Sequence, residues 1–512
     1  MPIAHTAAVA LQGLSGSLVS VEADISSNLP GFVIIGLPDT ALGEARDRVR
    51  AAATNSGCPL TGRKLTINLS PAALPKHGSS FDLAIAVAAL AADGMISAQS
   101  VAHVVHLGEL GLDGRLRPIA GALPAVLAAA RAGATAVMVP TGNADEASLV
   151  PGIRVIGVAS LLEAAIWHGG EFDPVAVDAI MPVASGRFPD DHLLDLADVI
   201  GNTDAVEAMQ VAAAGGHHVF LLGPPGAGKT MLAARLPGLL PDLTPDAALE
   251  VSSIRSLAGL PVGATLVTRP PLESPHHTAT AAALVGGGSG IIRPGAAARA
   301  SGGVLFLDEA PEFAGAVLDA LRQPLESGVI TIHRANSVAT FPGRFQLVLA
   351  ANPCPCGHYG ARDHACVCPP NARRRYLAKL SGPLLDRIDI QLTVSRITSA
   401  AMRISTDAPI TDTATARARV VRAREIAAIR LADTPWTLNS QVPGSWLRGP
   451  HARLGPATTA SIDRALERGG LTMRGYDRVL KVAWTLADLD AVDRPTPDHL
   501  GRALYLRKAI SS

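Results

Sequence analysis

Along the first third of the chain, short hydrophobic runs bounded by glycine or proline alternate with longer alanine-rich runs. Runs of the first kind predict strands, and they lie at 31–37, 64–70, 136–140 and 153–158. Runs of the second kind predict helices, and they lie at 81–93 and 123–133, where Gly133 ends the second. We therefore predict an α/β domain over residues 1–168.

The pattern becomes irregular at 169–190, where we predict a linker. A second α/β domain is predicted over 191–395, because short apolar runs at 219–222, 304–307 and 345–353 suit buried parallel strands. Residues 396–512 carry helical signals such as ARARVVRAREIAAIRLAD and are predicted to be mostly α-helical. The fold class is therefore α/β with a helical C-terminal part.

Composition supports a large folded protein and excludes two other classes. The 512 residues are 48% hydrophobic and 17% charged, which is typical of globular chains and not of disordered ones. The longest purely apolar run, 83–92, is half of the roughly 20 residues that a membrane span needs, so no membrane partner is expected. The N-terminus has no charged segment before an apolar core, so we expect a cytoplasmic protein.

The net charge is zero, with 44 basic and 44 acidic residues. A dedicated nucleic-acid-binding protein is usually basic. Any contact with DNA is therefore expected to come from local patches of positive charge.

The stretch HHVFLLGPPGAGKTMLAARL (217–236) contains the pattern G-x-x-x-x-G-K-[ST] between a predicted strand and a predicted helix. Backbone N–H groups of such a loop, together with the N-terminus of the following helix, surround phosphate oxygens. Lys229 is expected to contact the β- and γ-phosphates of ATP, and Thr230 to bind Mg²⁺. The predicted phosphate-binding residues are Gly223, Pro224, Pro225, Gly226, Ala227, Gly228, Lys229 and Thr230.

Two acids follow the apolar run 304–307, and ligands of open α/β sheets bind where such strands end. Asp308 is expected to help hold Mg²⁺, and Glu309 to orient or deprotonate the attacking water. Asn352 ends the third predicted strand, where it could hydrogen-bond the γ-phosphate or the water. The alternative for Asn352 is a turn former before proline.

Four of the five cysteines fall within fifteen residues, whereas Cys58 stands alone. The four thiolates of Cys354, Cys356, Cys366 and Cys368 could hold one Zn²⁺, with His358 or His364 as a substitute ligand. Such a zinc ion would be structural, because four protein ligands leave no open position. The alternative is a reduced loop without metal.

The motifs GPPGAGKT, FLDEA, AANPCPCG and LSGPLLDRIDI (380–390), in this order, resemble those of AAA+ ATPases. SPHHTAT (274–280) and the cysteine-rich stretch resemble, more narrowly, the magnesium-chelatase-like YifB/ComM family. This resemblance implies that Asn352 is the sensor-1 residue, Arg387 an arginine finger that reaches a neighbouring subunit's ATP, and Arg474 the sensor-2 residue of a helical lid. It also implies a homo-hexameric ring. The alternative for Arg387 is an ion pair with Asp386 or Asp389.

Two segments resemble the insertions of this AAA+ branch, one at about 262–300 and the other, a predicted β-hairpin, at 329–346. Four arginines in or near them could line the pore of a ring and contact DNA phosphates. The alternative is that they are solvated or paired with acids. These arginines are Arg293, Arg299, Arg334 and Arg344.

Residues 106–125 and the GSSFDLAIAVA segment resemble the proteolytic domain of Lon, which has the ribosomal S5 domain 2-type fold, and the related domain of RadA. Ser80 lies near the position of the Lon nucleophile. The matching lysine is absent, because residues 121–126 read Gly-Ala-Leu-Pro-Ala-Val. A serine without a base is a poor nucleophile, so we expect a non-proteolytic domain.

The leading expectation is a Mg²⁺-dependent, ring-forming ATPase that acts on DNA. The family resemblance implies ATP-driven branch migration or unwinding during recombination or natural transformation. Two alternatives are the ATPase motor subunit of a magnesium chelatase and a Lon-like protease. The Lon-like N-terminal part argues against the first, and the missing lysine argues against the second.

Overall fold

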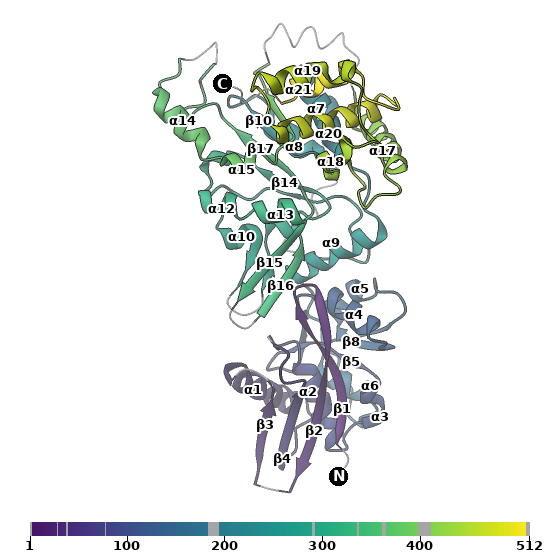
Figure 1. The fold of residues 1–512 in the computed structure, drawn as a ribbon. Coiled ribbons are helices and arrows are strands. Elements are labelled where there is room, and N and C mark those ends of the chain that lie inside the picture. The colour runs from purple at the N-terminus through teal and green to yellow at the C-terminus, as the bar shows by residue number, and fades with distance from the viewer. Residues whose placement is uncertain are drawn as a thin grey trace.

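The computed structural model describes residues 3–27, 29–36, 39–76, 78–182, 194–288, 292–334, 337–360, 365–397 and 411–507. Figure 1 shows two bodies stacked end to end, a lower body that contains the elements up to α6 and an upper body that contains those from α7 onward. None of the helices formed by the described residues combines the length and the apolar character that a membrane crossing requires.

A mixed seven-stranded sheet forms the lower body, in the order β3-β4-β2-β1-β5-β8-β9. The first two strands form a long antiparallel hairpin, and β5, β8 and β9 continue the sheet in parallel from β1. The hydrophobic runs predict no strands before residue 31, although buried and exposed positions alternate along much of β2. The strands are β1 (Ala4–Gln12), β2 (Ser15–Ser26), β3 (Gly31–Ile35), β4 (Lys64–Ser70), β5 (Val105–His106), β8 (Ala136–Pro140) and β9 (Arg154–Val158).

The helices of the lower body lie on both faces of this sheet. The almost entirely buried α2 packs against β1, β2, α1, α3 and α6, whereas α4 packs on the other face of β1 and β2. The predicted strands at 31–37, 64–70, 136–140 and 153–158 and the predicted helices at 81–93 and 123–133 are all present. The helices are α1 (Asp39–Asn55), α2 (Asp82–Ala92), α3 (Ala98–Ala102), α4 (Ala122–Arg131), η1 (Thr141–Asn143), α5 (Ala144–Ala147) and α6 (Leu161–Trp167), beside a small ladder of β6 (Glu109–Leu110) and β7 (Leu116–Arg117).

A five-stranded parallel sheet forms the centre of the upper body, in the order β11-β14-β17-β10-β18. Since all five strands run the same way, their carboxyl ends share one edge of the sheet and their amino ends share the other. The three central strands, β14, β17 and β10, are apolar except for Gln346, because both of their faces are covered. They are β10 (Val219–Leu222), β11 (Leu272–Glu273), β14 (Val304–Leu307), β17 (Gln346–Ala351) and β18 (Ile390–Thr393).

Helices and two hairpins cover this sheet. The hairpins, β12 (Gly286–Gly287) with β13 (Arg293–Pro294) and β15 (Val329–Arg334) with β16 (Ser337–Pro342), agree with the two predicted insertions. The helices before residue 390 are η2 (Leu196–Asp198), α7 (Thr203–Gly215), α8 (Lys229–Leu239), α9 (Pro245–Leu257), α10 (Ala281–Val285), α11 (Ala296–Arg299), η3 (Ala310–Glu312), α12 (Gly315–Asp319), α13 (Arg322–Ser327), α14 (Pro370–Ala378) and α15 (Gly382–Leu385).

The described residues after 410 are helical, as predicted, and their helices pack beside the sheet. Buried side chains of α17 and α20 share one apolar core with α7, α8 and the strands β10 and β18. These helices are α17 (Thr413–Arg430), η4 (Asn439–Gln441), α18 (Gly444–Leu447), α19 (Pro456–Glu467), α20 (Met473–Leu489) and α21 (Pro497–Tyr505).

The two bodies touch where α4 meets α9 and where the β1–β2 turn meets β16. Ser256 of α9 accepts a hydrogen bond from the N–H of Gly121 through its carbonyl (2.9 Å) and one from the N–H of Leu123 through its hydroxyl (3.3 Å). In this way α9 satisfies two of the free N–H groups at the start of α4. Part of the predicted linker, 183–190, lies outside the described residues.

Candidate functional site

The loop from Gly223 to Gly228 leaves the carboxyl end of β10 and enters α8, as the motif predicts. Gly226 (φ +76°) and Gly228 (φ +89°) adopt left-handed conformations that side chains rarely accept. The N–H of Gly223 donates to the carbonyl of Ala351 in β17 (3.1 Å), which ties the start of the loop to the neighbouring strand. The loop thus lies at the carboxyl edge of the sheet, where α/β proteins bind their ligands.

Lys229 connects this loop to Asn352. Its ammonium donates to the carbonyls of Gly223 (2.5 Å) and Pro224 (3.0 Å) and to the Oδ1 of Asn352 (3.1 Å). Burial lowers the pKa of Lys229, and the nearby carboxylates of Asp308 and Glu309 partly oppose this shift. The structure therefore brings Asn352 next to the lysine of the phosphate-binding loop.

Thr230 and Asp308 meet across the same edge. The Thr230 hydroxyl donates to Oδ2 of Asp308 (2.8 Å), and the other carboxylate oxygen accepts from the N–H of Glu309 (2.9 Å). A hydroxyl and a carboxylate at this distance form a donor set that suits Mg²⁺, which prefers oxygen ligands and keeps several waters. The residues present therefore fit the predicted magnesium site.

Glu309 has an unusual environment. Its backbone is left-handed (φ +50°), which is uncommon for a residue other than glycine and is concentrated at functional sites. Its carboxylate lies 3.3 Å from Nδ1 of His277, which follows β11, the strand beside β14. The sequence motifs predict no role for His277. Its position just after a strand, like that of the acids at 308–309, is the signal that would have found it.

Arg387 and Arg474 lie at the opposite, amino edge of the sheet. Arg387 precedes β18, and Arg474 of α20 donates to Oδ2 of Asp386 (3.2 Å). Both arginines line a cavity of about 950 Å³. Arg387 pairs with the carboxylate of Glu326 in α13, so the alternative pair with Asp386 or Asp389 does not form. Arg387 and Arg474 therefore lie near each other, at the edge of the sheet opposite to Lys229.

A buried network joins this edge to α20. The carboxylate of Asp389, only 3% exposed, lies 2.9 Å from Nδ1 of His217 and pairs with Arg478. Burial alone would raise the pKa of Asp389, but the positive charge of Arg478 and the His217 hydrogen bond hold it well below its usual range. His217 also bonds Thr485 of α20 (2.8 Å), so the starts of β10 and β18 are connected to one helix.

The four arginines of the two insertions have different surroundings. Arg299 pairs with Glu273 (2.8 Å) and so has the acid partner of the alternative interpretation. Arg293 and Arg334 are exposed on neighbouring hairpins, and Arg344 is exposed beyond β16. The two hairpins are in contact. This is shown at Gly286 of β12, where an added β-carbon would lie only 2.8 Å from Cδ1 of Ile332 in β15. The turn residues 335–336 lie outside the described residues.

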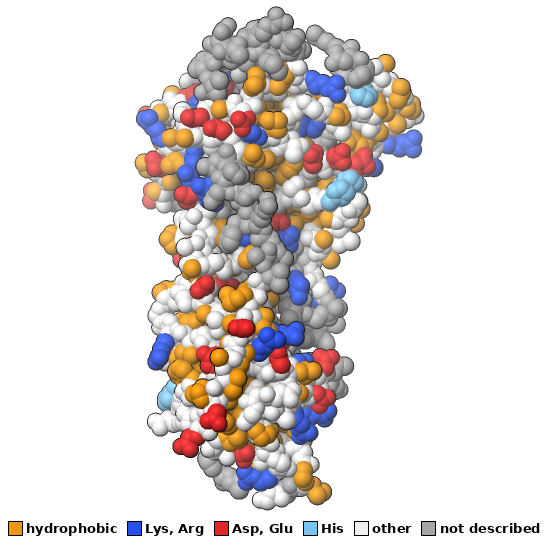
Figure 2. Space-filling view, turned by 180° about the vertical axis from the view of Figure 1, so that it is seen from behind, with side chains coloured by type: hydrophobic (Ala, Val, Ile, Leu, Met, Phe, Trp, Pro, Cys, Tyr) orange, Lys and Arg blue, Asp and Glu red, His pale blue; other side chains and the backbone are white. Residues whose placement is uncertain are grey.

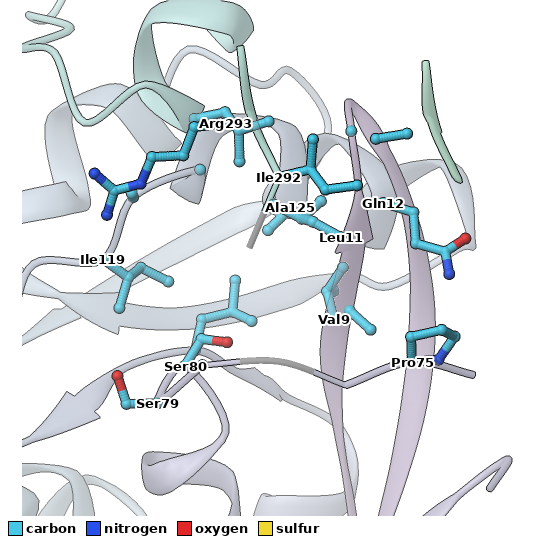
Figure 3. A pocket seen from close by; sticks show the side chains of 18 of the residues that line it. Val9, Leu11, Gln12, Pro75, Ser79, Ser80, Ile119, Ala125, Ile292 and Arg293 are labelled. Atoms are coloured by element: carbon cyan, nitrogen blue, oxygen red, sulfur yellow. The ribbon is translucent and has the colours of Figure 1, made fainter. Parts of the chain in front are cut away.

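Ser80 lines a cavity of about 440 Å³ between the two bodies. Figure 3 shows Ser79 and Ser80 on one side of this cavity and Arg293 on another. The hydroxyl of Ser79 donates to Glu109, and Lys76 in the preceding loop donates its ammonium to the carbonyls of Pro71 (2.5 Å) and Leu74 (3.2 Å).

The four clustered cysteines converge on one point, and their sulfur atoms all lie within 4.8 Å of one another. Sγ of Cys354 lies 3.4 Å from that of Cys356 and 3.7 Å from that of Cys366. Four sulfurs around Zn²⁺ with bonds of about 2.3 Å would be about 3.8 Å apart, whereas a disulfide needs about 2.05 Å. The cluster therefore fits a metal better than a disulfide. His358 is described, and His364 lies outside the described residues.

Comparisons with known proteins cover nearly the whole chain. Three family models match, "Subunit ChlI of Mg-chelatase" at 21–143, "Magnesium chelatase, subunit ChlI" at 195–402 and "Magnesium chelatase, subunit ChlI C-terminal" at 411–507. The chain is 48% identical to uncharacterized protein Rv2897c of Mycobacterium tuberculosis over 509 residues (99% of each chain). It is 40% identical to competence protein ComM of Haemophilus influenzae over 511 residues (100% of this chain, 98% of the relative).

The chain is also 40% identical to the uncharacterized protein YifB of Escherichia coli over 511 residues (99% of this chain, 97% of the relative). A shorter likeness, 31% identity over 150 residues, relates 28% of the chain to 19% of a Lon protease of Mycolicibacterium smegmatis. The mixed α/β fold, the parallel sheet and these full-length likenesses together show that the chain belongs to the YifB/ComM family of magnesium-chelatase-like AAA+ proteins.

Proposed function

We propose that the protein is a Mg²⁺-dependent AAA+ ATPase that assembles as a ring, most simply a homo-hexamer, and acts on DNA. The observation that carries this proposal is the division of groups between the two edges of the upper sheet. Lys229, Thr230, Asp308 and Asn352 gather at the carboxyl edge, whereas Arg387 is held at the amino edge. One protomer therefore supplies two different halves of a nucleotide site.

At the carboxyl edge, the loop's N–H groups and the N-terminus of α8 would hold the β- and γ-phosphates. Lys229 would exchange its carbonyl partners for phosphate oxygens, and Asn352 would then be free to contact the γ-phosphate or the attacking water. Thr230 and Asp308 would hold Mg²⁺, which neutralises charge on the phosphates when bound. Glu309 would accept a proton from the attacking water once its carboxylate leaves His277.

At the amino edge, Arg387 and Arg474 would act on the nucleotide of the next protomer. A planar, permanently charged guanidinium stabilises negative charge that spreads over the γ-phosphoryl oxygens in the transition state. Because such contacts join two different surfaces, they repeat around a closed ring. Arg474 is 76% exposed at its side chain and is thus accessible to a neighbour.

DNA is the proposed substrate of the motor, and branch migration or unwinding during recombination or transformation is the proposed work. Lys and Arg side chains are interspersed with Asp and Glu on the face seen in Figure 2, in keeping with zero net charge. Contacts would therefore be few per protomer and repeated around the ring, with Arg293 and Arg334 on the paired hairpins as the leading candidates. A relative carries the name competence protein, which agrees with this class of substrate.

The deciding experiment compares ATP turnover without DNA, with single-stranded DNA and with forked DNA, at about 50 mM and about 200 mM salt. We expect stimulation by DNA that weakens at the higher salt concentration. Lys229→Ala should abolish ATP binding, whereas Glu309→Gln should retain binding and stop hydrolysis. Hydrolysis without any DNA binding or stimulation would reject the DNA substrate, and stimulation by a porphyrin-binding partner would favour the chelatase alternative.

We also propose that the four clustered cysteines hold one structural Zn²⁺. The support is the convergence of four sulfurs within 4.8 Å of one another, three of which are separated by 3.4 to 3.7 Å. Metal analysis of the purified protein should find about one zinc per chain. Zinc well below one equivalent, with no effect of chelation, would reject this site.

A further inference from the structure

The cysteine cluster lies against the phosphate-binding loop. Gly357, between Cys356 and His358, is buried and left-handed (φ +79°), and its N–H donates to the carbonyl of Cys354 (2.9 Å). A β-carbon added to Gly357 would lie 2.6 Å from Cδ and 2.7 Å from Cγ of Pro225. The turn of the cluster is therefore packed directly on the second proline of the loop, with no room for a methyl group.

The cluster is also joined to Asn352. Cys354 follows Asn352 after a single proline and is completely buried, so its position and that of the sensor side chain are covalently linked. On the C-terminal side of the cluster, α14 begins at Pro370, two residues after Cys368. Tyr376 in this helix is buried, which raises the pKa of its hydroxyl to about 12, and the nearby backbone of Asn352 partly opposes this shift. The segments before Cys354 and after Cys368 thus both connect the cluster to Asn352.

A cation–π contact joins the turn to the same helix. The guanidinium of Arg373 in α14 lies over the ring of Tyr359, 4.0 Å from its centroid. Tyr359 also donates its backbone N–H to Sγ of Cys354 (3.4 Å). The turn is accordingly held between the helix on one side and the phosphate-binding loop on the other.

We propose that the metal-bound cysteine cluster is a positioning element of the nucleotide site, which holds Pro225 and Asn352 at the spacing that ATP requires. This inference rests on the proposed zinc and nucleotide sites. Its physical basis is that four metal–sulfur bonds would fix the two short segments that carry the cysteines, and one of these segments packs against the loop. Loss of the metal would let Pro225 and Asn352 shift and would weaken ATP binding without removing any group that contacts ATP.

Gly357→Ala tests the contact without touching a metal ligand, and Gly360→Ala is its matched control. Gly360 has a similar backbone (φ +77°), but nothing lies within 4 Å of an added β-carbon. The full-length protein and both variants would be compared for zinc content by metal analysis and for the affinity of a fluorescent ATP analogue by titration. We expect all three to hold about one zinc. Gly357→Ala should bind nucleotide about ten- to a hundredfold more weakly, because overpacking of a tight contact has a cost of that order, and Gly360→Ala should bind it within about twofold of wild type.

Removal of the metal is the second arm of the test. Cys366→Ser and Cys368→Ser should lose zinc and show the same weakening as Gly357→Ala, while circular dichroism reports whether the fold is retained. Normal nucleotide affinity in zinc-free, folded protein would overturn the inference, and so would normal affinity in Gly357→Ala. Wild-type protein that holds zinc but binds no nucleotide would instead reject the proposed ATPase function.

Discussion

Replacement of Arg387 by alanine tests the division of the nucleotide site between protomers. Arg387 precedes the four-residue strand β18, and the phosphate-binding loop follows the parallel strand β10 beside it. At about 3.3 Å per residue, the two edges are at least about 13 Å apart. A charge at that distance contributes only about 0.3 kcal/mol in water and about 1 kcal/mol at an effective dielectric constant of 20. Acting on its own protomer's ATP, Arg387 would therefore change the rate less than about tenfold.

Acting on a neighbour's ATP, the same side chain would be worth far more. Arginine fingers raise phosphoryl-transfer rates about 10³- to 10⁵-fold, which corresponds to about 4–7 kcal/mol of barrier. We therefore expect Arg387→Ala to bind ATP normally and to lose at least about a thousandfold in turnover. The losses of turnover expected for Arg387→Ala therefore differ by a factor of about a hundred or more between action on its own ATP and action on a neighbour's ATP. A steady-state ATPase assay resolves this difference easily.

Mixed assemblies provide a second test of whether Arg387 acts on the ATP of its own protomer or on that of a neighbour. Arg387→Ala and Lys229→Ala protomers, each inactive alone, would be mixed in equal amounts and allowed to reassemble. An interface becomes active when an intact loop faces an intact Arg387, and random mixing produces this at about a quarter of the interfaces. A mixture no more active than its components, or a loss below tenfold in Arg387→Ala alone, would refute action across the interface.

Three further predictions follow from buried or paired groups. Asp389→Asn should lower the free energy of unfolding by about 3–5 kcal/mol in denaturant titrations, because it leaves Arg478 without its buried partner; a loss below about 1 kcal/mol would contradict this. His277→Ala should raise ATP turnover without DNA and reduce the stimulation by DNA, because it frees Glu309; an unchanged ratio of stimulated to basal rate would argue against that role. Burial raises the pKa of Glu146 to about 7 from 4.5, so the folded protein favours the protonated carboxyl group. The contribution of this group to stability is complete below pH 4.5 and is lost as the pH rises through 7. Between pH 5 and pH 8 the free energy of unfolding should therefore fall less in Glu146→Gln than in wild type, with a difference of up to about 3 kcal/mol in urea titrations. Parallel pH profiles of the two proteins would contradict the shift.

Local sequence patterns were sufficient for the phosphate-binding loop and its flanking elements. The strand at 219–222, the helix that begins at Lys229 and the strand at 304–307 all form where the hydrophobic runs and glycines predict them. These features depend on interactions within a few residues, such as helical hydrogen bonds and the left-handed glycines, which a single stretch of sequence specifies.

Other elements escaped the sequence analysis because their signals are weak or distant. The β1–β2 hairpin lies in a segment of small and polar residues, so its alternation is recognisable mainly after the buried face is known. The pairing of His277 with Glu309 depends on β11 lying beside β14, and sheet order is not encoded within either strand. The helices after residue 410 are predicted from their own pattern, but the core that they share with α7 depends on contacts between residues about two hundred positions apart.

By itself, the sequence determined which chemical groups this protein possesses, namely a phosphate-binding loop, two acids, an amide, two arginines and four thiols, and it placed the loop, the acids and the amide at strand ends. Only the tertiary structure decided which of them meet. It placed Arg387 and Arg474 at the edge opposite Lys229, packed Gly357 on Pro225 and drew the thiols to one point. The physical reason is that strand order and packing are set by contacts between distant segments, whose energies depend on the shape of the whole core and not on any local pattern.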